Sequence, residues 1–366
     1  MNVEIAGVGI HPFGRFEGVT NTDMGVHAVR CALAEAGDPP FQAAFCGTAY
    51  GGVASGHKVL GAIAKTGVPI VDVEAGCASG GAALQLAAGA IRAGQYECAL
   101  VFGVEKMPKG IIRSSFFEPW REEGGLAATP AYFALRAQRL LREAGLTKDH
   151  LAHVVVKNRR HGVHNPNAMF RKEVTVDEVL ASRVVSEPLH LWMLCSPNEG
   201  AAAVVLRRGS GSGVTLASAR LRSHLPGSVL GEATPLAGID DADITPPSTL
   251  AVDDAYAEAG IGPDDVDVVE CQDTDAAREL LAYQELRLCA PGDQAKVLVE
   301  RGDTINPSGG LLSKGEPLGA SGLGQVVELV HQLRGEAGPR QVENARVGLA
   351  HTVGRGANAC CVIVTR

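Results

Sequence analysis

The chain has 366 residues, of which 46% are hydrophobic, and a net charge of −8 at pH 7; this length predicts two domains or one large α/β unit with a substantial core. The negative charge argues against a nucleic-acid-binding protein, and without an uninterrupted apolar run of about 18 residues no membrane span is predicted. Nine cysteines, an odd number, and the lack of a basic and apolar leader favour a cytoplasmic protein.

Short apolar runs alternate with helical segments of small residues in the first half of the chain, which is typical of an α/β protein. This pattern predicts strands at 3–10, 43–49, 68–73, 97–104 and 201–206, and helices at 24–36 and 78–93. Between 108 and 190 the periodicity breaks up, in a stretch that holds aromatic residues and a basic cluster at 157–161. Because a long insertion of this kind usually carries recognition, we expect it to shape a binding site.

The glycine- and serine-rich segment 209–213 is typical of a linker. Beyond it the alternation resumes, with strands predicted at 214–221, 266–270, 346–350 and 359–365 and helices at 249–259, 275–288 and 322–333. The last two strands are predicted to pair as a hairpin. Since both parts contain the same kinds of element, residues 1–208 and 214–366 are interpreted as two copies of one α/β unit.

Cys77 stands between a predicted strand and a helix rich in glycine and alanine. A thiol at the amino end of a helix lies near unpaired backbone N–H groups and the positive end of the helix dipole, and both stabilise the thiolate. Cys77 is therefore the candidate nucleophile for covalent acyl chemistry.

The other cysteines in apolar contexts are interpreted as core residues, because free cysteine packs like a small hydrophobic side chain. They are Cys31, Cys46, Cys98, Cys195, Cys289, Cys360 and Cys361. The sequence contains no Cys-x-x-Cys pair, so neither a metal site nor a redox pair is expected.

A family resemblance is carried by several segments in chain order: 74–80 around Cys77, 103–107, 195–203, 306–315 and 348–351. With them the chain resembles the thiolase superfamily, closest to the sterol-carrier-protein-type thiolases, also called lipid-transfer-protein-type thiolases. The resemblance implies an α/β thiolase fold, with two βαβαβαββ halves in a five-layered core, 108–190 as an inserted loop domain, and usually a dimer. It also implies that Cys77 is acylated and that backbone N–H groups of Cys77, Gly354 and Gly356 form an oxyanion hole.

The chain departs from the family pattern where a Gly-His-Pro motif normally supplies the histidine that activates the cysteine. Here the motif reads Gly315-Glu316-Pro317, and a carboxylate cannot both donate and accept as neutral imidazole does. Three interpretations of Glu316 remain open. It is an acid/base in altered chemistry, a structural ion pair with Arg355 or Lys314 while His351 serves Cys77, or the mark of a disabled site.

A second family motif, which helps to bind a thioester oxygen, reads Gln272-Asp273-Thr274-Asp275 here, and Gln272 keeps a donor for this purpose. The leading hypothesis is an acyltransferase that makes or breaks a carbon–carbon bond in an acyl-coenzyme A thioester, with Cys77 as acyl acceptor, His351 as base and Glu316 as a modified acid/base. One alternative is a retro-aldolase on a β-hydroxyacyl-coenzyme A. Another is a non-catalytic acyl-binding or scaffold subunit.

The basic cluster in the insertion has two interpretations. Its residues, Lys157, Arg159, Arg160 and His161, bind the phosphates of coenzyme A, or they form an ordinary exposed charged face. Coenzyme A is expected as part of the substrate, with no tightly bound cofactor. The resemblance further implies a homodimer and, in some relatives, a small zinc-ribbon and OB-fold partner protein.

Overall fold

The computed structural model describes residues 2–109, 120, 123–124, 129–209, 213–226, 244–354 and 358–366. Its main sheet has nine strands in the order β3-β2-β4-β7-β1-β8-β11-β10-β9. The strands of its first half are β1 (Val3–Gly14), β2 (Ala43–Gly47), β3 (Ile70–Val73), β4 (Cys98–Lys106) and β7 (Glu199–Arg208). Those of its second half are β8 (Thr215–Arg222), β9 (Val268–Cys271), β10 (Val347–Val353) and β11 (Ala359–Thr365).

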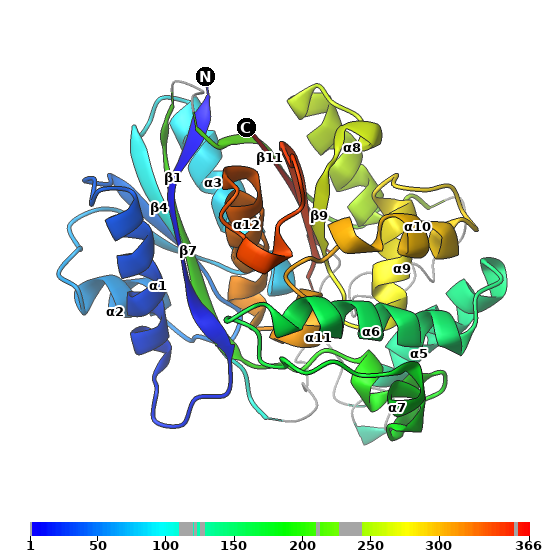
Figure 1. The fold of residues 1–366 in the computed structure, drawn as a ribbon. Coiled ribbons are helices and arrows are strands. Elements are labelled where there is room, and N and C mark those ends of the chain that lie inside the picture. Colours follow the sequence, from blue (N-terminus) through cyan, green and yellow to red (C-terminus); the bar gives the residue numbers. More distant parts are fainter. Residues whose placement is uncertain are drawn as a thin grey trace.

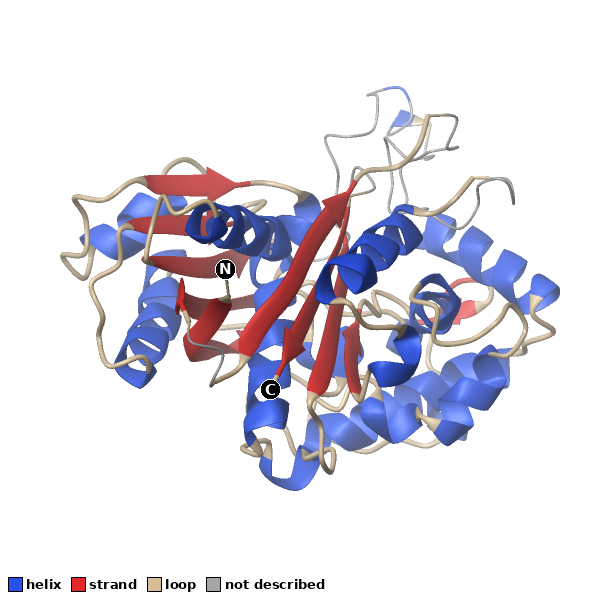
Figure 2. Ribbon diagram, turned by 90° about the horizontal axis from the view of Figure 1, so that it is seen from above, coloured by secondary structure: helices blue, strands red, loops and turns tan. Residues whose placement is uncertain are grey.

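The two half-sheets join between β1 and β8 through a single residue pair, Glu4 opposite Thr215. Each half-sheet has its own helices: α1 (Asn21–Glu35), α2 (Ser55–Gly61) and α3 (Ser79–Arg92) in the first, and α8 (Pro247–Ala259), α9 (Ala276–Glu285) and α12 (Leu318–Arg334) in the second. Helices α3 and α12 lie between the half-sheets, α1 and α2 cover the outer face of the first, and α8 and α9 cover the outer face of the second (Figures 1 and 2). This arrangement confirms the five-layered core.

The contact between α3 and α12 depends on small residues. A side-chain carbon added to Gly80 of α3 would lie only 2.9 Å from the Gly319 carbonyl oxygen of α12. A carbon added to Gly103 of β4 would overlap the same oxygen. Since larger side chains would push these backbones apart, the glycines and alanines in these segments set how closely the central helices approach.

The element order of the first half is β1-α1-β2-α2-β3-α3-β4-β7, which confirms the expected βαβαβαββ unit. In the second half, the strand that would correspond to β3 is reduced to a single parallel bridge between Val269 and Ile305. Strands β10 and β11 pair antiparallel, as predicted.

No helix was predicted within 108–190, although much of this range is helical. Helices α5 (Thr129–Glu143), α6 (Lys148–Val163) and α7 (Val176–Ala181) form there, together with a short hairpin of β5 (Val184–Ser186) and β6 (Leu189–His190). Their apolar residues share one core with α9 and the neighbouring strands of the second half. The helices were not predicted, because their apolar residues pack against distant elements. These residues therefore do not repeat regularly at the helical period along the segment.

Three short helices were also missed: α2, α10 (Gln294–Glu300) and α11 (Gly310–Lys314). In the described part of the chain, no helix is both long and apolar enough to cross a membrane.

Candidate active site

Cys77 lies in a tight turn between β3 and α3, within the 3-10 turn Gly76–Ala78. Ser79 holds this turn, because its hydroxyl donates to the Gly76 carbonyl oxygen at 2.6 Å and accepts from the Ala75 amide at 2.9 Å. The thiol is 6% exposed and packs beside Met107 and Leu318. The structure thus places Cys77 at the amino end of α3, as predicted, where the helix dipole favours a thiolate.

The loop after β10 packs directly against this turn. A side-chain carbon on Gly354 would overlap the Ala75 carbonyl oxygen and lie 3.1 Å from the Ala78 nitrogen. The Gly354 amide, however, donates to the Asn358 carbonyl oxygen at 2.7 Å. Its hydrogen is therefore engaged within the loop, which does not support Gly354 as a donor to a substrate oxygen. Gly356 lies outside the described residues.

Glu316 is buried, at 4% exposure, and receives hydrogen bonds on both carboxylate oxygens. The Gln272 amide nitrogen donates to Oε1 at 2.7 Å, and the Cys195 thiol donates to Oε2 at 3.1 Å. The backbone of Glu316 is also fixed, since its amide donates to the Ser196 carbonyl oxygen at 2.9 Å. Gln272 and Glu316, which the sequence analysis named for separate roles, are therefore in direct contact.

The ion-pair interpretation of Glu316 is not supported for Lys314, because the Lys314 ammonium lies 3.2 Å from Glu270 instead. Arg355 lies outside the described residues. Glu316 stands two residues before α12, just as Cys77 stands two residues before α3. The positive ends of both central helices are therefore close to the two groups that carry negative charge in a thiolate–carboxylate site.

Cys195 was interpreted from the sequence as an inert core residue, and the structure corrects this. It is half-buried, lines the same cavity as Cys77, and touches Glu316. Burial raises the pKa of the Cys195 thiol well above its usual value, and Glu316, Asp273 and Cys77 act in the same direction. The available signal was its position at the start of the segment 195–203, one of those that carry the family resemblance.

These groups open onto a cavity of about 900 Å³. Its apolar lining includes Phe133, Phe170, Leu191, Trp192, Leu194 and Val353. Its cationic lining consists of Arg15, Lys109, Arg159, Arg171, Lys172 and Arg183. Among the described lining residues, the remaining titratable groups are Cys77, Cys195 and Glu316. The cavity therefore combines apolar walls with positive charge and places two thiols and one carboxylate together.

The predicted basic cluster does not act as a unit, because successive residues of α6 point in different directions. Of its four members, only Arg159 lines the cavity, with its guanidinium 4.0 Å from the centre of the Phe170 ring. Burial lowers the pKa of Arg159 to about 10.

The other three members of the cluster have protein partners. The Lys157 ammonium is buried and lies 2.9 Å from a Glu279 oxygen. Arg160 pairs with Asp303 at the surface. His161 Nδ1 lies 2.9 Å from the Asn306 carbonyl oxygen, and burial lowers the pKa of His161 to about 4. These contacts do not support a shared phosphate site.

His351 is fully buried in β10, and its Nε2 lies 2.9 Å from the Ser248 hydroxyl of α8. Because side chains alternate along a strand, His351 faces the outer helices, whereas its neighbour Thr352 lies near Gly81 and Gly322 of the central helices. Burial lowers the pKa of His351 well below its usual value, with the charge of Arg278 acting in the same direction. His351 is not among the residues that line the cavity, so its predicted role as the base for Cys77 is not supported.

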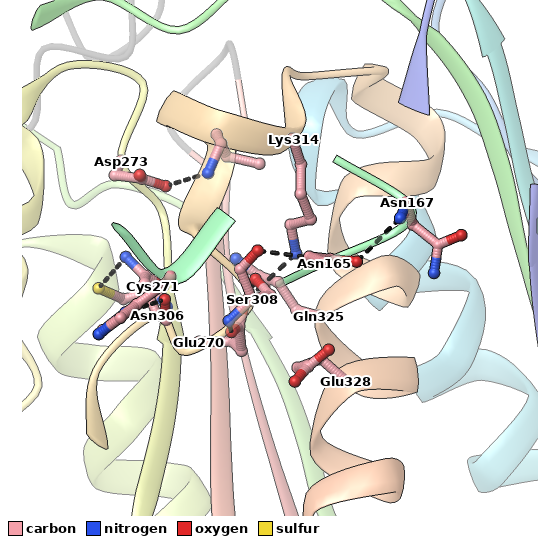
Figure 3. Close-up of polar contacts among 12 residues, drawn as sticks. Asn165, Asn167, Glu270, Cys271, Asp273, Asn306, Ser308, Lys314, Gln325 and Glu328 are labelled. Atoms are coloured by element: carbon pink, nitrogen blue, oxygen red, sulfur yellow. Dashed lines mark hydrogen bonds and ion pairs between the residues drawn. The ribbon is translucent and has the colours of Figure 1, made fainter. Parts of the chain in front are cut away.

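A buried polar network holds α11 and the Glu316 segment in place (Figure 3). The Ser308 amide and hydroxyl both donate to Glu270, at 2.9 and 2.6 Å. Asp273 accepts from the amides of Leu311 and Leu312 at the start of α11, at 2.6 and 3.1 Å. Since buried carboxylates with several donors are strongly oriented, this network fixes the backbone that leads into Glu316. No group of side chains suited to holding a metal ion occurs in the described part of the chain.

Comparisons with known proteins agree with this geometry. The family model described as "Thiolase, N-terminal domain" matches residues 3–210, and that described as "Thiolase C-terminal domain-like" matches 236–366. Sterol carrier protein 2 of Bos taurus is 35% identical over 398 residues, covering 99% of this chain and 71% of the relative. Benzoylsuccinyl-CoA thiolase subunit BbsB of Thauera aromatica is 35% identical over 382 residues, covering 98% and 96%. The solved Ltp2-ChsH2(DUF35) aldolase has the same fold, with a TM-score of 0.85 at 23% identity, over 100% of this chain and 97% of that one.

Proposed function

The chain belongs to the thiolase family, and from this premise we propose that it makes or breaks a carbon–carbon bond in an acyl-coenzyme A thioester through an acyl-enzyme on Cys77. The observation that carries the proposal is the placement of Cys77. It is a buried thiol at the amino end of α3 that opens onto a large cavity with apolar walls and cationic groups. Such a position favours both the thiolate and an acyl group attached to it.

The cavity lining supports the proposed substrate class. The arginine and lysine side chains of the lining other than Arg15, whose guanidinium donates to three backbone carbonyl oxygens, suit the phosphates of coenzyme A, because charge-assisted hydrogen bonds to phosphate are among the strongest polar contacts. The aromatic and aliphatic walls suit a bulky apolar acyl group. Coenzyme A thus enters as part of the substrate.

Glu316 supports the first step of the reaction. Held by Gln272 and Cys195, its carboxylate accepts the proton of the Cys77 thiol as the sulfur attacks the substrate carbonyl carbon. The carbon–carbon bond then breaks and leaves the acyl group on Cys77. In this proposal Glu316 replaces the histidine usual in the family, and His351 has a structural role.

The acyl-enzyme can be tested directly. The protein is incubated with a β-ketoacyl-coenzyme A, and its intact mass and the release of acetyl-coenzyme A are measured. We expect one acyl adduct in the wild type and in Cys31→Ala, a control that removes an exposed thiol. Cys77→Ala should show no adduct and no release. Full turnover by Cys77→Ala without an adduct would show that the covalent mechanism is wrong.

A second candidate is retro-aldol cleavage of a β-hydroxyacyl-coenzyme A. The observation that favours it is the oriented carboxylate of Glu316, which suits removal of a hydroxyl proton. The name of the fold neighbour, an aldolase, supports it as well. In that reaction Cys77 forms no bond to the substrate, so Cys77→Ser would keep cleaving a β-hydroxyacyl-coenzyme A. Loss of this cleavage in Cys77→Ser would favour the acyl-enzyme.

We also propose a homodimer. Strand β3 lies at the end of the sheet, and its outer edge carries no neighbouring strand in the described part of the chain. Val71 on this strand is exposed, as are Tyr50 and Val53 between β2 and α2 and Leu86 on α3. A second copy that covers this edge would bury them. Native mass spectrometry tests this, and a monomer at micromolar concentration would contradict it.

A small zinc-ribbon and OB-fold partner remains a proposal too. It is supported by the printed names of two relatives, a thiolase "subunit" and an aldolase with a DUF35 component. Co-purification followed by native mass tests the proposal. Full activity of the isolated chain would count against it.

A further inference from the structure

The cationic residues that line the cavity differ in exposure. Lys109, Arg171, Lys172 and Arg183 are exposed, whereas Arg159 is only 8% exposed. In coenzyme A the phosphates are separated from the thioester by the whole pantetheine arm, so exposed cations suit them best. The buried guanidinium of Arg159 therefore needs a different explanation.

Arg159 has no anionic partner within the described part of the chain. Its Nε is buried without a hydrogen-bond partner, and the other guanidinium nitrogens make neither a hydrogen bond nor an ion pair with the described residues. Burial lowers the pKa of Arg159 to about 10, and no described carboxylate acts in the opposite direction. Since an unpaired buried charge is costly, a guanidinium in such a place is expected to meet an anion from outside the chain.

The Phe170 ring orients this guanidinium without using its hydrogen-bond donors. The guanidinium carbon lies 4.0 Å from the centre of the ring, so the ring covers one face of the cation. The N–H groups project in the plane of the guanidinium, and stacking does not occupy them. A planar carboxylate accepts two parallel hydrogen bonds from such an edge.

Backbone contacts tie Arg159 to the segment that leads into Glu316. The Ser313 hydroxyl donates to the Asn158 carbonyl oxygen at 2.8 Å, and the Ser313 carbonyl oxygen accepts from the Phe170 amide at 2.9 Å. Ser313 stands three residues before Glu316 in sequence. Arg159 and the ring it stacks on are therefore held to the part of the chain that carries a reacting group.

We propose that Arg159 binds a carboxylate of the acyl group, so that the substrate is an acyl-coenzyme A with a free acid on its acyl chain. This inference rests on the proposed function and specifies the substrate class of the same cavity. Arg159 and Cys77 both line the cavity, and its apolar walls suit the carbon chain between the carboxylate and the thioester. The exposed cations remain for the phosphates.

Equilibrium binding tests the inference without relying on turnover. Dissociation constants are measured by calorimetry for pairs of ligands matched in chain length, namely succinyl- and butyryl-, glutaryl- and pentanoyl-, and adipoyl- and hexanoyl-coenzyme A. The Cys77→Ala protein is used, because it cannot form an acyl-enzyme with these ligands. In at least one pair, the carboxylate should bind about tenfold or more tightly than its uncharged counterpart.

Arg159→Met, added to this protein, removes the charge and keeps an unbranched side chain against Phe170. The preference for the carboxylate should fall to within about threefold, whereas binding of the uncharged ligands should change little. Arg160→Met is the matched control and should keep the full preference, because Arg160 pairs with Asp303 at the surface. If Arg159→Met does not fold, Arg159→Lys replaces it and should bind the carboxylates more weakly, since an ammonium lacks the planar edge.

The outcomes separate this inference from the proposed function. Absence of a preference in every pair would overturn the inference. Equal weakening of both ligands of a pair by Arg159→Met would overturn it too, because Arg159 would then contact the phosphates. Turnover of β-ketoadipyl- and β-ketohexanoyl-coenzyme A by the wild type is measured in parallel. A binding preference without turnover of either substrate would refute the proposed function and leave the carboxylate site standing.

Discussion

The Gln272 amide and the Glu316 carboxylate are joined by a buried hydrogen bond of 2.7 Å. Gln272 comes from the segment that follows β9, and Glu316 from the turn between α11 and α12. The contact shows that two departures from the usual family motifs are one structural unit. The amide N–H can donate to the Glu316 side chain whether or not that side chain is protonated, so Gln272 fixes its orientation.

Glu316→Gln should lower kcat of carbon–carbon cleavage by about 100-fold or more, because an amide cannot accept the Cys77 proton. KM should change little, since Glu316 lies with the two thiols and not with the cationic lining. Steady-state kinetics measures both constants. Glu300→Gln, at an exposed position of α10, is the matched control. An unchanged kcat in Glu316→Gln would remove Glu316 from the mechanism.

Arg159→Ala should raise KM for the coenzyme A substrate about tenfold or more and leave kcat nearly unchanged, because a charge-assisted contact contributes about 1.5–3 kcal/mol. Arg160 is the next residue on α6 and pairs with Asp303 at the surface. Arg160→Ala should therefore leave both constants unchanged. Initial rates over a range of substrate concentrations test the pair. Equal effects in the two variants would contradict a specific role for Arg159.

His351→Leu should destabilise the protein by about 1–3 kcal/mol, because the buried Ser248 hydroxyl loses one of its two partners and keeps only the Arg278 guanidinium. Activity per folded molecule should stay within about twofold of the wild type. Denaturant unfolding gives the stability, and turnover at equal folded concentration gives the activity. Ser248→Ala should behave similarly. A 100-fold loss of kcat in His351→Leu alone would restore His351 as the base.

His161 should make the protein less stable in mild acid. Its pKa lies near 6.5 in the unfolded chain and at about 4 in the folded protein, so the unfolded chain binds more protons between these values. Stability is therefore lost as pH falls from 6.5 towards 4, by an amount on the order of 2–3 kcal/mol. Unfolding at several pH values should show a smaller loss in His161→Gln. His164→Gln, at an exposed position three residues away, should keep the wild-type slope.

The sequence predicts the two half-sheets well because their periodicity is local. Apolar runs such as 98–104 are buried on both faces, so hydrophobicity alone marks them as strands. The position of Cys77 could also be predicted from the sequence, because a strand followed by a glycine-rich helix defines the turn between them.

The partners of Glu316 could not be predicted in the same way. Cys195 and Gln272 are 121 and 44 residues away in sequence, and the Cys195 contact depends on how the segment before β7 meets the second half. The orientation of His351 also depends on the strand's register, because a shift by one residue would turn it towards the other face. The charge of α6 was misread for a related reason: adjacent residues on a helix face different neighbours, and only Arg159 faces the cavity.

In the proposed chemistry, activity also depends on how α3 and α12 are placed relative to each other. Cys77 stands two residues before α3 and Glu316 two residues before α12, and the half-sheets to which these helices belong are joined by one residue pair. The close contact between Gly80 of α3 and Gly319 of α12 therefore sets the distance between the Cys77 thiol and the Glu316 carboxylate. Substitutions at this contact between the two helices can change the reaction rate while every reacting group is conserved. Natural variation in specificity within such a fold can therefore arise in the core as readily as in the cavity wall.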